Sequence, residues 1–142
     1  MFTGIVQSKS LKAKLIKKSF GVELSVSVEN GFTKNLKKGD SIAVNGVCLT
    51  VCSFSKKIIK FEIIHESLRL SNLVKNISMP LNLERSLKMG EEIGGHLVSG
   101  HVHCMGKVKQ FKKGKEKILT ISKPSSVKEL SLIHISEPTR PY

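Results

Sequence analysis

Apolar and polar residues alternate along several short stretches of the chain. The clearest is GVELSVSV, residues 21–28, in which valine or leucine stands at every second position, the pattern of a half-buried β-strand. Turn residues bound further stretches of the same kind. The pattern therefore predicts an all-β protein. We expect strands over residues 22–28, 41–44, 47–54, 58–64 and 80–84, and a strand-turn-strand unit over residues 107–121.

The dipeptide Asn45-Gly46 separates two of these predicted strands. Asn-Gly favours a type I′ turn, in which both central residues have positive φ, so residues 41–54 are expected to form a tight hairpin. The segment HESLRLSNL, residues 65–73, predicts a short helical turn. Pro80 can begin an edge strand, because a missing N–H group costs nothing at that position.

A short internal similarity suggests a repeat. The segment FTGIV, residues 2–6, aligns with VSGHV, residues 98–102, and the second copy follows a stretch rich in Gly and His that begins at Met89. Each copy has an apolar residue, a hydroxyl residue and a glycine before a predicted strand. This predicts that a second copy of the first domain begins near residue 97.

The chain has 142 residues, 39% of them hydrophobic, and a formal net charge of +13. This length suits one domain, or one small domain and a fragment of another. Lysine supplies 21 of the 24 basic residues, and the aromatic residues that single-strand binders stack on bases are not interleaved with them. We expect a solvated lysine-rich surface and no nucleic-acid partner; a nucleic-acid-binding barrel is the alternative.

Cysteine usage and the N-terminus point to one compartment. Three cysteines are an odd number, and no charged segment followed by an apolar one opens the chain. No apolar run approaches the roughly 18 residues of a membrane span. We therefore expect a cytoplasmic protein with free thiols and no membrane partner.

Several familiar chemical motifs are absent from the sequence. Cys48 with Cys52, or His101 with His103, could share a strand face, but the spacing of zinc ligands is missing, so no metal is expected. Asp40, the only aspartate, is a turn residue and leaves no Ser-His-Asp arrangement. What remains is a pocket for a planar polar heterocycle, with a thiol or an imidazole for proton transfer.

Five motifs then carry a family resemblance: MFTGIV, GDSIAVNGVCLTV, FEIIHESLRLSNL, LNLERSLK and GGHLVSGHV. In this order and spacing, over residues 1 to about 110, they resemble riboflavin synthases of the alpha-chain type. The resemblance implies two similar six-stranded antiparallel Greek-key barrels and a homotrimer. We expect the first barrel over residues 1–96 and an incomplete second copy over residues 97–129.

The resemblance also implies an activity. Two molecules of 6,7-dimethyl-8-ribityllumazine would exchange a four-carbon unit to give riboflavin and 5-amino-6-ribitylamino-pyrimidinedione, without a cofactor. Each barrel would bind one lumazine, and the catalytic pocket would form between barrels of neighbouring subunits. A non-catalytic lumazine- or flavin-binding protein of the same fold is the alternative.

Site residues follow from the resemblance by position. Cys48, His101, Ser41 and Thr50 are the expected catalytic groups. Ser67 and Ser71 stand where the family usually has threonine, and Val74 replaces a common glycine. The expected substrate-binding residues are Gly4, Ile5, Val6, Cys48, Leu49, Thr50, Glu62, Ile63, Ile64, His65, Glu66, Ser67, Gly100, His101 and Val102.

The sequence of the last residues, 130–142, does not fit the rest of the chain. The segment LSLIHISEPTR resembles the translation of a sequencing adapter, so we expect a non-native tail; a natural strand with a Pro-bounded turn is the alternative. With only the start of a second barrel, the chain as written is expected to bind lumazine without turning it over.

Overall fold

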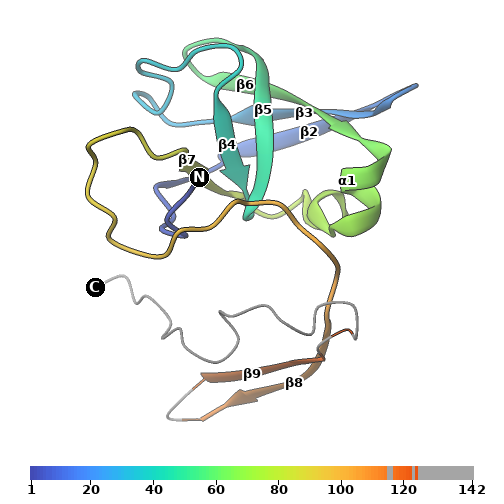
Figure 1. The fold of residues 1–142 in the computed structure, drawn as a ribbon. Helices are drawn as coiled ribbons and strands as arrows, with labels where there is room; N and C mark the ends of the chain where they lie inside the picture. Colours follow the sequence, from blue (N-terminus) through green and yellow to red (C-terminus); the bar gives the residue numbers. More distant parts are fainter. Residues whose placement is uncertain (115–116, 123, 125–142) are drawn as a thin grey trace. The chain divides into compact units, whose positions relative to one another are not determined.

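The structure, a computed structural model, describes residues 1–114, 117–122 and 124 (Figure 1). The chain divides into two compact units, residues 1–102 and a second that starts at His103. The expected tail, residues 130–142, lies outside the described residues. The strands are β1 (Ser8–Lys9), β2 (Lys12–Lys18), β3 (Gly21–Ser27), β4 (Ser41–Val44), β5 (Val47–Phe54), β6 (Ile58–Ile64), β7 (Asn82–Arg85), β8 (Lys107–Lys113) and β9 (Lys117–Ser122); the helices are α1 (His65–Leu70) and a 3₁₀ turn (Leu73–Asn76).

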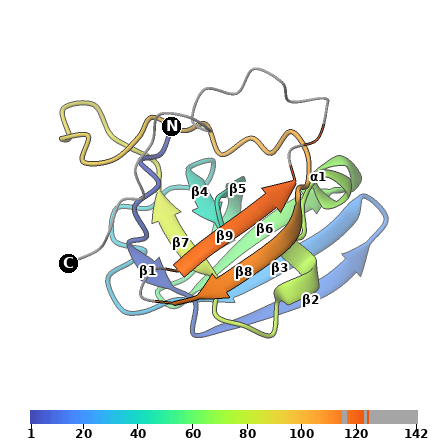
Figure 2. The same cartoon turned by 90° about the horizontal axis from the view of Figure 1, so that it is seen from below.

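The first unit is one antiparallel sheet with the strand order β1-β7-β4-β5-β6-β3-β2. Strands β4, β5 and β6 follow one another as hairpins, and β7 returns to lie beside β4, which is a Greek-key arrangement. The long strands β6, β3 and β2 run side by side (Figure 2). The fold class expected from the sequence is confirmed by this topology.

The two ends of the strand order meet in the sequence. Only Ser10 and Leu11 separate β1 from β2. The Ser10 amide donates to the Leu81 carbonyl at 2.8 Å beside β7, and the Leu11 amide donates to the Ser27 carbonyl at 2.8 Å at the end of β3. Strands β1 and β2 are thus two parts of one bent strand. Counted in this way, the seven strands of the first unit form a six-stranded sheet that curls into a barrel.

Apolar and polar residues alternate along the strands, so that the apolar side chains fill the barrel and the others lie on its outer surface. Leu24, Val26, Val51, Ile59 and Phe61 are each at most 1% exposed and lie in one core cluster. Successive side chains of a strand point to opposite faces. The residues between these core positions on β5 and β6 therefore point outward, and the expected site residues are among them.

The predicted hairpin is confirmed in detail. Asn45 has φ 48° and Gly46 has φ 81°, as a type I′ turn requires, and they join β4 directly to β5. Strand β2 was not among the expected strands. Its sequence from Lys12 is KAKLIKK, in which only Ala13 and Leu15 pack against the core, so its hydrophobic signal is weak.

The hairpin β8–β9 repeats the pairing of β2–β3. Residues 12 and 27 pair in the first hairpin, and residues 107 and 122, each 95 positions further on, pair in the second. The next pair, Ala13 with Val26, has its counterpart in Val108 with Ile121 at the same offset. This agreement in register supports the expected repeat.

We predict that Ser10→Ala destabilises the barrel where β1 turns into β2. Ser10 is 4% exposed, and its hydroxyl oxygen accepts a hydrogen bond from the Leu81 amide at 2.7 Å. Leaving that buried amide unpaired costs about 1–3 kcal/mol, measurable by urea denaturation. Ser8→Ala is the control, because the Ser8 hydroxyl has only a 3.5 Å contact with Lys9. Equal stabilities of the two variants would contradict the prediction.

Candidate functional site

A row of outward side chains crosses three strands of the barrel. Ala43 on β4 pairs with Glu84 on β7 on one side and with Cys48 on β5 on the other. Directly paired residues of antiparallel strands have their side chains on the same face. Their neighbours Val44, Leu83 and Val47 are core residues, so Glu84, Ala43 and Cys48 face the outside.

Two distant parts of the chain cover this row. Phe2 and Val98 form a two-residue bridge in which the Phe2 amide donates to Val98 at 2.8 Å and the Val98 amide donates to Phe2 at 3.1 Å. The Gly100 carbonyl accepts a hydrogen bond from the Cys48 amide at 2.9 Å. Phe2 is 1% exposed. The N-terminal segment and residues 98–100 are thereby fixed together against β5.

A small cavity of about 170 Å³ opens beside Cys48. Strand β5, helix α1 and residues 100–102 surround it, and the helix ends where the Ser71 hydroxyl donates to the Ser67 carbonyl at 2.7 Å. This volume is below the approximately 300–1,000 Å³ of typical ligand pockets, so it holds only part of a heterocyclic ligand. The lining residues, five of them expected site residues, are Val47, Cys48, Ser67, Leu70, Gly100, His101 and Val102.

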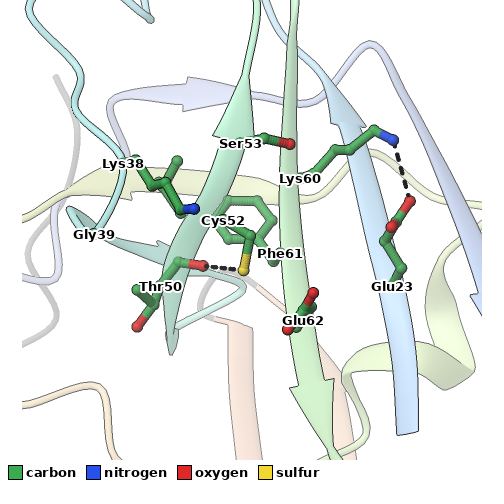
Figure 3. A pocket seen from close by; sticks show the side chains of 10 residues that line it. Glu23, Lys38, Gly39, Thr50, Cys52, Ser53, Lys60, Phe61 and Glu62 are labelled. Atoms are coloured by element: carbon green, nitrogen blue, oxygen red, sulfur yellow. Dashed lines mark hydrogen bonds and ion pairs between the residues drawn. The ribbon is translucent and has the colours of Figure 1, made fainter. Parts of the chain in front are cut away.

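A larger cavity of about 630 Å³ lies over the outer faces of β3, β5 and β6 (Figure 3). Thr50 and Glu62, both expected site residues, line it together with Lys38 and Cys52. Thr50 stands two residues from Cys48 on β5, roughly 7 Å along the strand. The two cavities are therefore neighbours on the outward side of one strand.

The polar groups of the larger cavity are of mixed sign. Lys60 and Glu23 form an ion pair at 3.3 Å, and the Cys52 thiol donates to the Thr50 carbonyl at 3.6 Å (Figure 3). Lysine amines, carboxylates and hydroxyls together offer both donors and acceptors. Such a lining suits a ligand that carries many hydroxyl groups and no net charge.

The remaining expected residues differ in their placement. Ser41 pairs with Thr50 and is half-buried on β4. Ile5 and Val6 follow the covering N-terminal segment and are 42% and 48% exposed. Ile64 is 57% exposed at the end of β6.

Two of the expected substrate-binding residues point away from any outer site. Leu49 is 4% exposed and Ile63 is 1% exposed, and both lie in the core cluster. They stand between the outward residues of β5 and β6, where strand alternation turns their side chains inward. Only their backbone groups are positioned to meet a ligand on the outer face.

Helix α1 carries two further expected residues, His65 and Glu66. The His65 ring nitrogen Nε2 lies 3.3 Å from the Ser19 carbonyl. Arg69 donates to Glu66 at 3.0 and 2.6 Å, and these hydrogen bonds lower the pKa of the Glu66 carboxyl. Glu66 is therefore ionised at neutral pH and paired on the helix surface.

Sequence reasoning missed Glu84 and the lysines of the larger cavity. Glu84 is 7% exposed, although its place between Leu83 and Arg85 in LNLER gives no sign of burial. Its partners, Thr3 and Gly4, are about 80 positions away in the sequence. Only the strand register brings it into line with Cys48.

Metal-binding clusters, membrane-spanning helices and free thiols are the other features that bear on function. Among the described residues, no group of three or more His, Cys, Asp or Glu is arranged to hold a metal ion. None of the described helices has the length and apolar character needed to cross a bilayer. Cys48, Cys52 and Cys104 are free thiols.

Comparisons with known proteins agree with the resemblance seen in the motifs. The family model of the lumazine binding domain matches residues 3–86. Riboflavin synthases from Buchnera aphidicola of Baizongia pistaciae, Buchnera aphidicola of Schizaphis graminum and Escherichia coli are 43%, 39% and 36% identical over 79%, 94% and 76% of the chain. The aligned part is 53%, 63% and 51% of those proteins. The chain thus spans little more than half the length of these curated relatives.

Solved structures show the same fold. LumP complexed with riboflavin superposes with a TM-score of 0.75 at 22% identity, over 89% of this chain and 70% of LumP. LumP complexed with 6,7-dimethyl-8-(1′-D-ribityl) lumazine gives a TM-score of 0.74, also at 22% identity, over 88% of this chain and 70% of LumP.

Proposed function

Because the chain belongs to the lumazine-binding domain family, we propose that residues 1–102 bind 6,7-dimethyl-8-ribityllumazine and that the complete protein is a riboflavin synthase. The observation that carries this proposal is made on the outer face of β5. There Cys48 lines the smaller cavity and Thr50 lines the larger cavity next to it. The riboflavin synthases that match the chain at 34–43% identity support the activity.

The two cavities suit the two halves of such a ligand. The pteridine ring is planar and needs a narrow space with a few polar groups, as the cavity beside Cys48, Ser67 and His101 provides. The ribityl chain is flexible and carries several hydroxyl groups. We assign it to the larger cavity, where Thr50, Glu62 and Lys38 supply donors and acceptors.

Proton transfer is the chemistry asked of these side chains. The 7-methyl group of the lumazine is acidic, because its anion delocalises into the ring, so a moderate base is sufficient. Cys48 and His101 line the ring cavity and are proposed to move this proton, with Ser41 and Thr50 polarising the ligand. General acid–base catalysis of this kind contributes about 10²–10⁴-fold.

Orientation of the two lumazine rings is proposed to contribute more to the rate than proton transfer does. The reaction joins two identical rings, and stacking them in one pocket makes the encounter intramolecular, worth roughly 7–11 kcal/mol. We propose that residues 1–102 supply one of the two ring sites and that the second barrel supplies the other. We also propose that the complete protein is a cytoplasmic homotrimer that needs no cofactor.

The test uses a half-reaction that needs only one bound lumazine. In D₂O the chain is expected to accelerate deuterium exchange of the 7-methyl protons, followed as loss of the methyl signal by proton NMR. Cys48→Ser is expected to slow this exchange by about 10- to 100-fold, within the range of one acid–base group. The matched control, Cys104→Ser, is expected to exchange at the wild-type rate, since Cys104 is a free thiol that lines neither cavity.

A non-catalytic lumazine or flavin carrier is the second candidate, favoured by the fold shared with LumP. A carrier predicts saturable binding of lumazine and riboflavin with no acceleration of methyl exchange. A chain that binds neither compound, and binds oligonucleotides with strongly salt-dependent affinity, would contradict both candidates.

A further inference from the structure

We propose that Glu84 is a positioning residue for the ligand site, which holds the N-terminal turn and, through it, the segment that carries His101. The inference rests on the proposed function for its ligand. Glu84 lies on β7, two strands from Cys48 in the row Glu84-Ala43-Cys48, roughly 10 Å away at the usual strand spacing. It lines neither cavity beside β5, so it acts through other residues.

The carboxylate of Glu84 is almost fully occupied by the N-terminal turn. One oxygen, Oε1, accepts hydrogen bonds from the Thr3 amide at 2.6 Å and from the Thr3 hydroxyl at 2.8 Å. The Gly4 amide donates to both oxygens at 3.2 Å. Only 7% of the residue is exposed.

Nothing else neutralises this buried acid in the described part of the chain. No lysine, arginine or histidine there comes within ion-pair distance of it. A buried charge is tolerated only where hydrogen bonds replace its hydration. The turn at Thr3 and Gly4 is therefore held by the strong, charge-assisted kind of hydrogen bond.

The turn at Thr3 and Gly4 is connected to the cavity beside Cys48 by a short series of contacts. Thr3 follows Phe2, whose backbone bridges Val98. Two residues beyond Val98, the Gly100 carbonyl accepts from the Cys48 amide. Fixing Thr3 thus fixes Phe2, and Phe2 fixes the segment that enters the cavity.

Two turns of the same form meet at this place, and in the described part of the chain only the first is hydrogen-bonded to a carboxylate. The Thr3 hydroxyl accepts from the Ile5 amide at 3.2 Å, and the Ser99 hydroxyl accepts from the His101 amide at 3.1 Å. Among the described residues, no acidic side chain is hydrogen-bonded to the turn at Ser99. The second turn, which places His101, depends for its position on the bridge to Phe2 and on Cys48.

The experiment compares Glu84→Gln with the wild-type chain. Glutamine has the same shape but replaces one acceptor by an NH₂ group that faces the Gly4 amide. We expect lumazine to bind about 10- to 100-fold more weakly, the ratio expected when charged hydrogen bonds are lost. The Cys48 amide should exchange with solvent faster, while the core amide of Phe61 stays protected.

A merely structural role would give a different result. In that case the amides of Cys48 and Phe61 would lose protection together, and the lumazine affinity of the folded fraction would not change. Unchanged affinity and unchanged Cys48 exchange in a folded Glu84→Gln chain would also overturn the proposal. If this variant does not fold, Thr3→Val decides, because it removes one hydrogen bond to Glu84 and leaves the acid in place; Thr3→Ser, which keeps the hydroxyl, is its matched control.

Failure of the proposed function remains distinguishable. A wild-type chain that does not bind lumazine would reject the ligand assignment alone. The exchange rate of the Cys48 amide in the variants would still show whether Glu84 positions the segment.

Discussion

Replacing Gly100 with alanine is expected to detach residues 98–102 from β5 and to abolish most lumazine binding. A Cβ atom at this position would lie 2.9 Å from the Cys48 Cβ, 3.0 Å from the Phe2 ring and 3.1 Å from the Cys48 backbone nitrogen. Gly100 also has φ +75°, which costs other residues about 1–2 kcal/mol. With overpacking of about 1–3 kcal/mol, the expected total is about 2–5 kcal/mol.

The chain can avoid part of this cost by releasing the segment, and both outcomes are measurable. If the segment stays, the free energy of unfolding falls; if it leaves, the Cys48 amide loses its partner and exchanges faster. Gly4→Ala is the matched control for stability. Gly4 occupies the equivalent place in the first turn with φ +82°, but nothing lies within 4 Å of its would-be Cβ. Equal losses in the two variants would contradict the close approach at Gly100.

Phe61→Ala is expected to have the other large effect, a loss of about 3–5 kcal/mol in the free energy of unfolding. Phe61 is fully buried in the middle of β6. It pairs with Leu24 on β3 and with Val51 on β5, both of them core residues. The ring would leave a cavity in the core beneath the middle of the sheet, and the pairing of β6 with β3 and β5 limits how far the backbone can move to fill it.

Phe54→Ala controls for loss of an aromatic ring as such. Phe54 ends β5 and is 40% exposed, so its removal is expected to change the free energy of unfolding by less than about 1 kcal/mol. Urea denaturation of both variants makes the comparison. A small loss for Phe61→Ala would mean that the alternation on β6 does not point into a packed core.

The central strands of the barrel could be predicted from the sequence because their alternation is nearly uninterrupted. On β6, burial alternates residue by residue from Ile58 to Ile64, and the Asn45-Gly46 turn fixes the register of β4 and β5. The same alternation explains why Leu49 and Ile63 face the core although the resemblance implied that they bind substrate. A sequence motif identifies a segment near the site, whereas the alternation of the strand determines which side chains of that segment point towards a ligand on the outer face.

The parts that were missed depend on contacts between distant residues. Strand β2 has little apolar surface of its own and forms because β3 offers it a partner along its whole length. Glu84 can hold the N-terminal turn only because β7 pairs with β4 and the N-terminal segment lies across these two strands. Neither relation leaves a periodic signal in the chain.

The position of the lysines gives the high positive charge a physical role. Strand β2 ends the strand order of the barrel, and in the described part of the chain only β3 pairs with it. Among the described residues, strand β8 pairs only with β9. Strands β2 and β8 each carry four lysines within seven residues. Lysine on a strand with unpaired backbone groups resists pairing with strands of other molecules, so these lysines oppose aggregation through the strand edges that have no partner among the described residues.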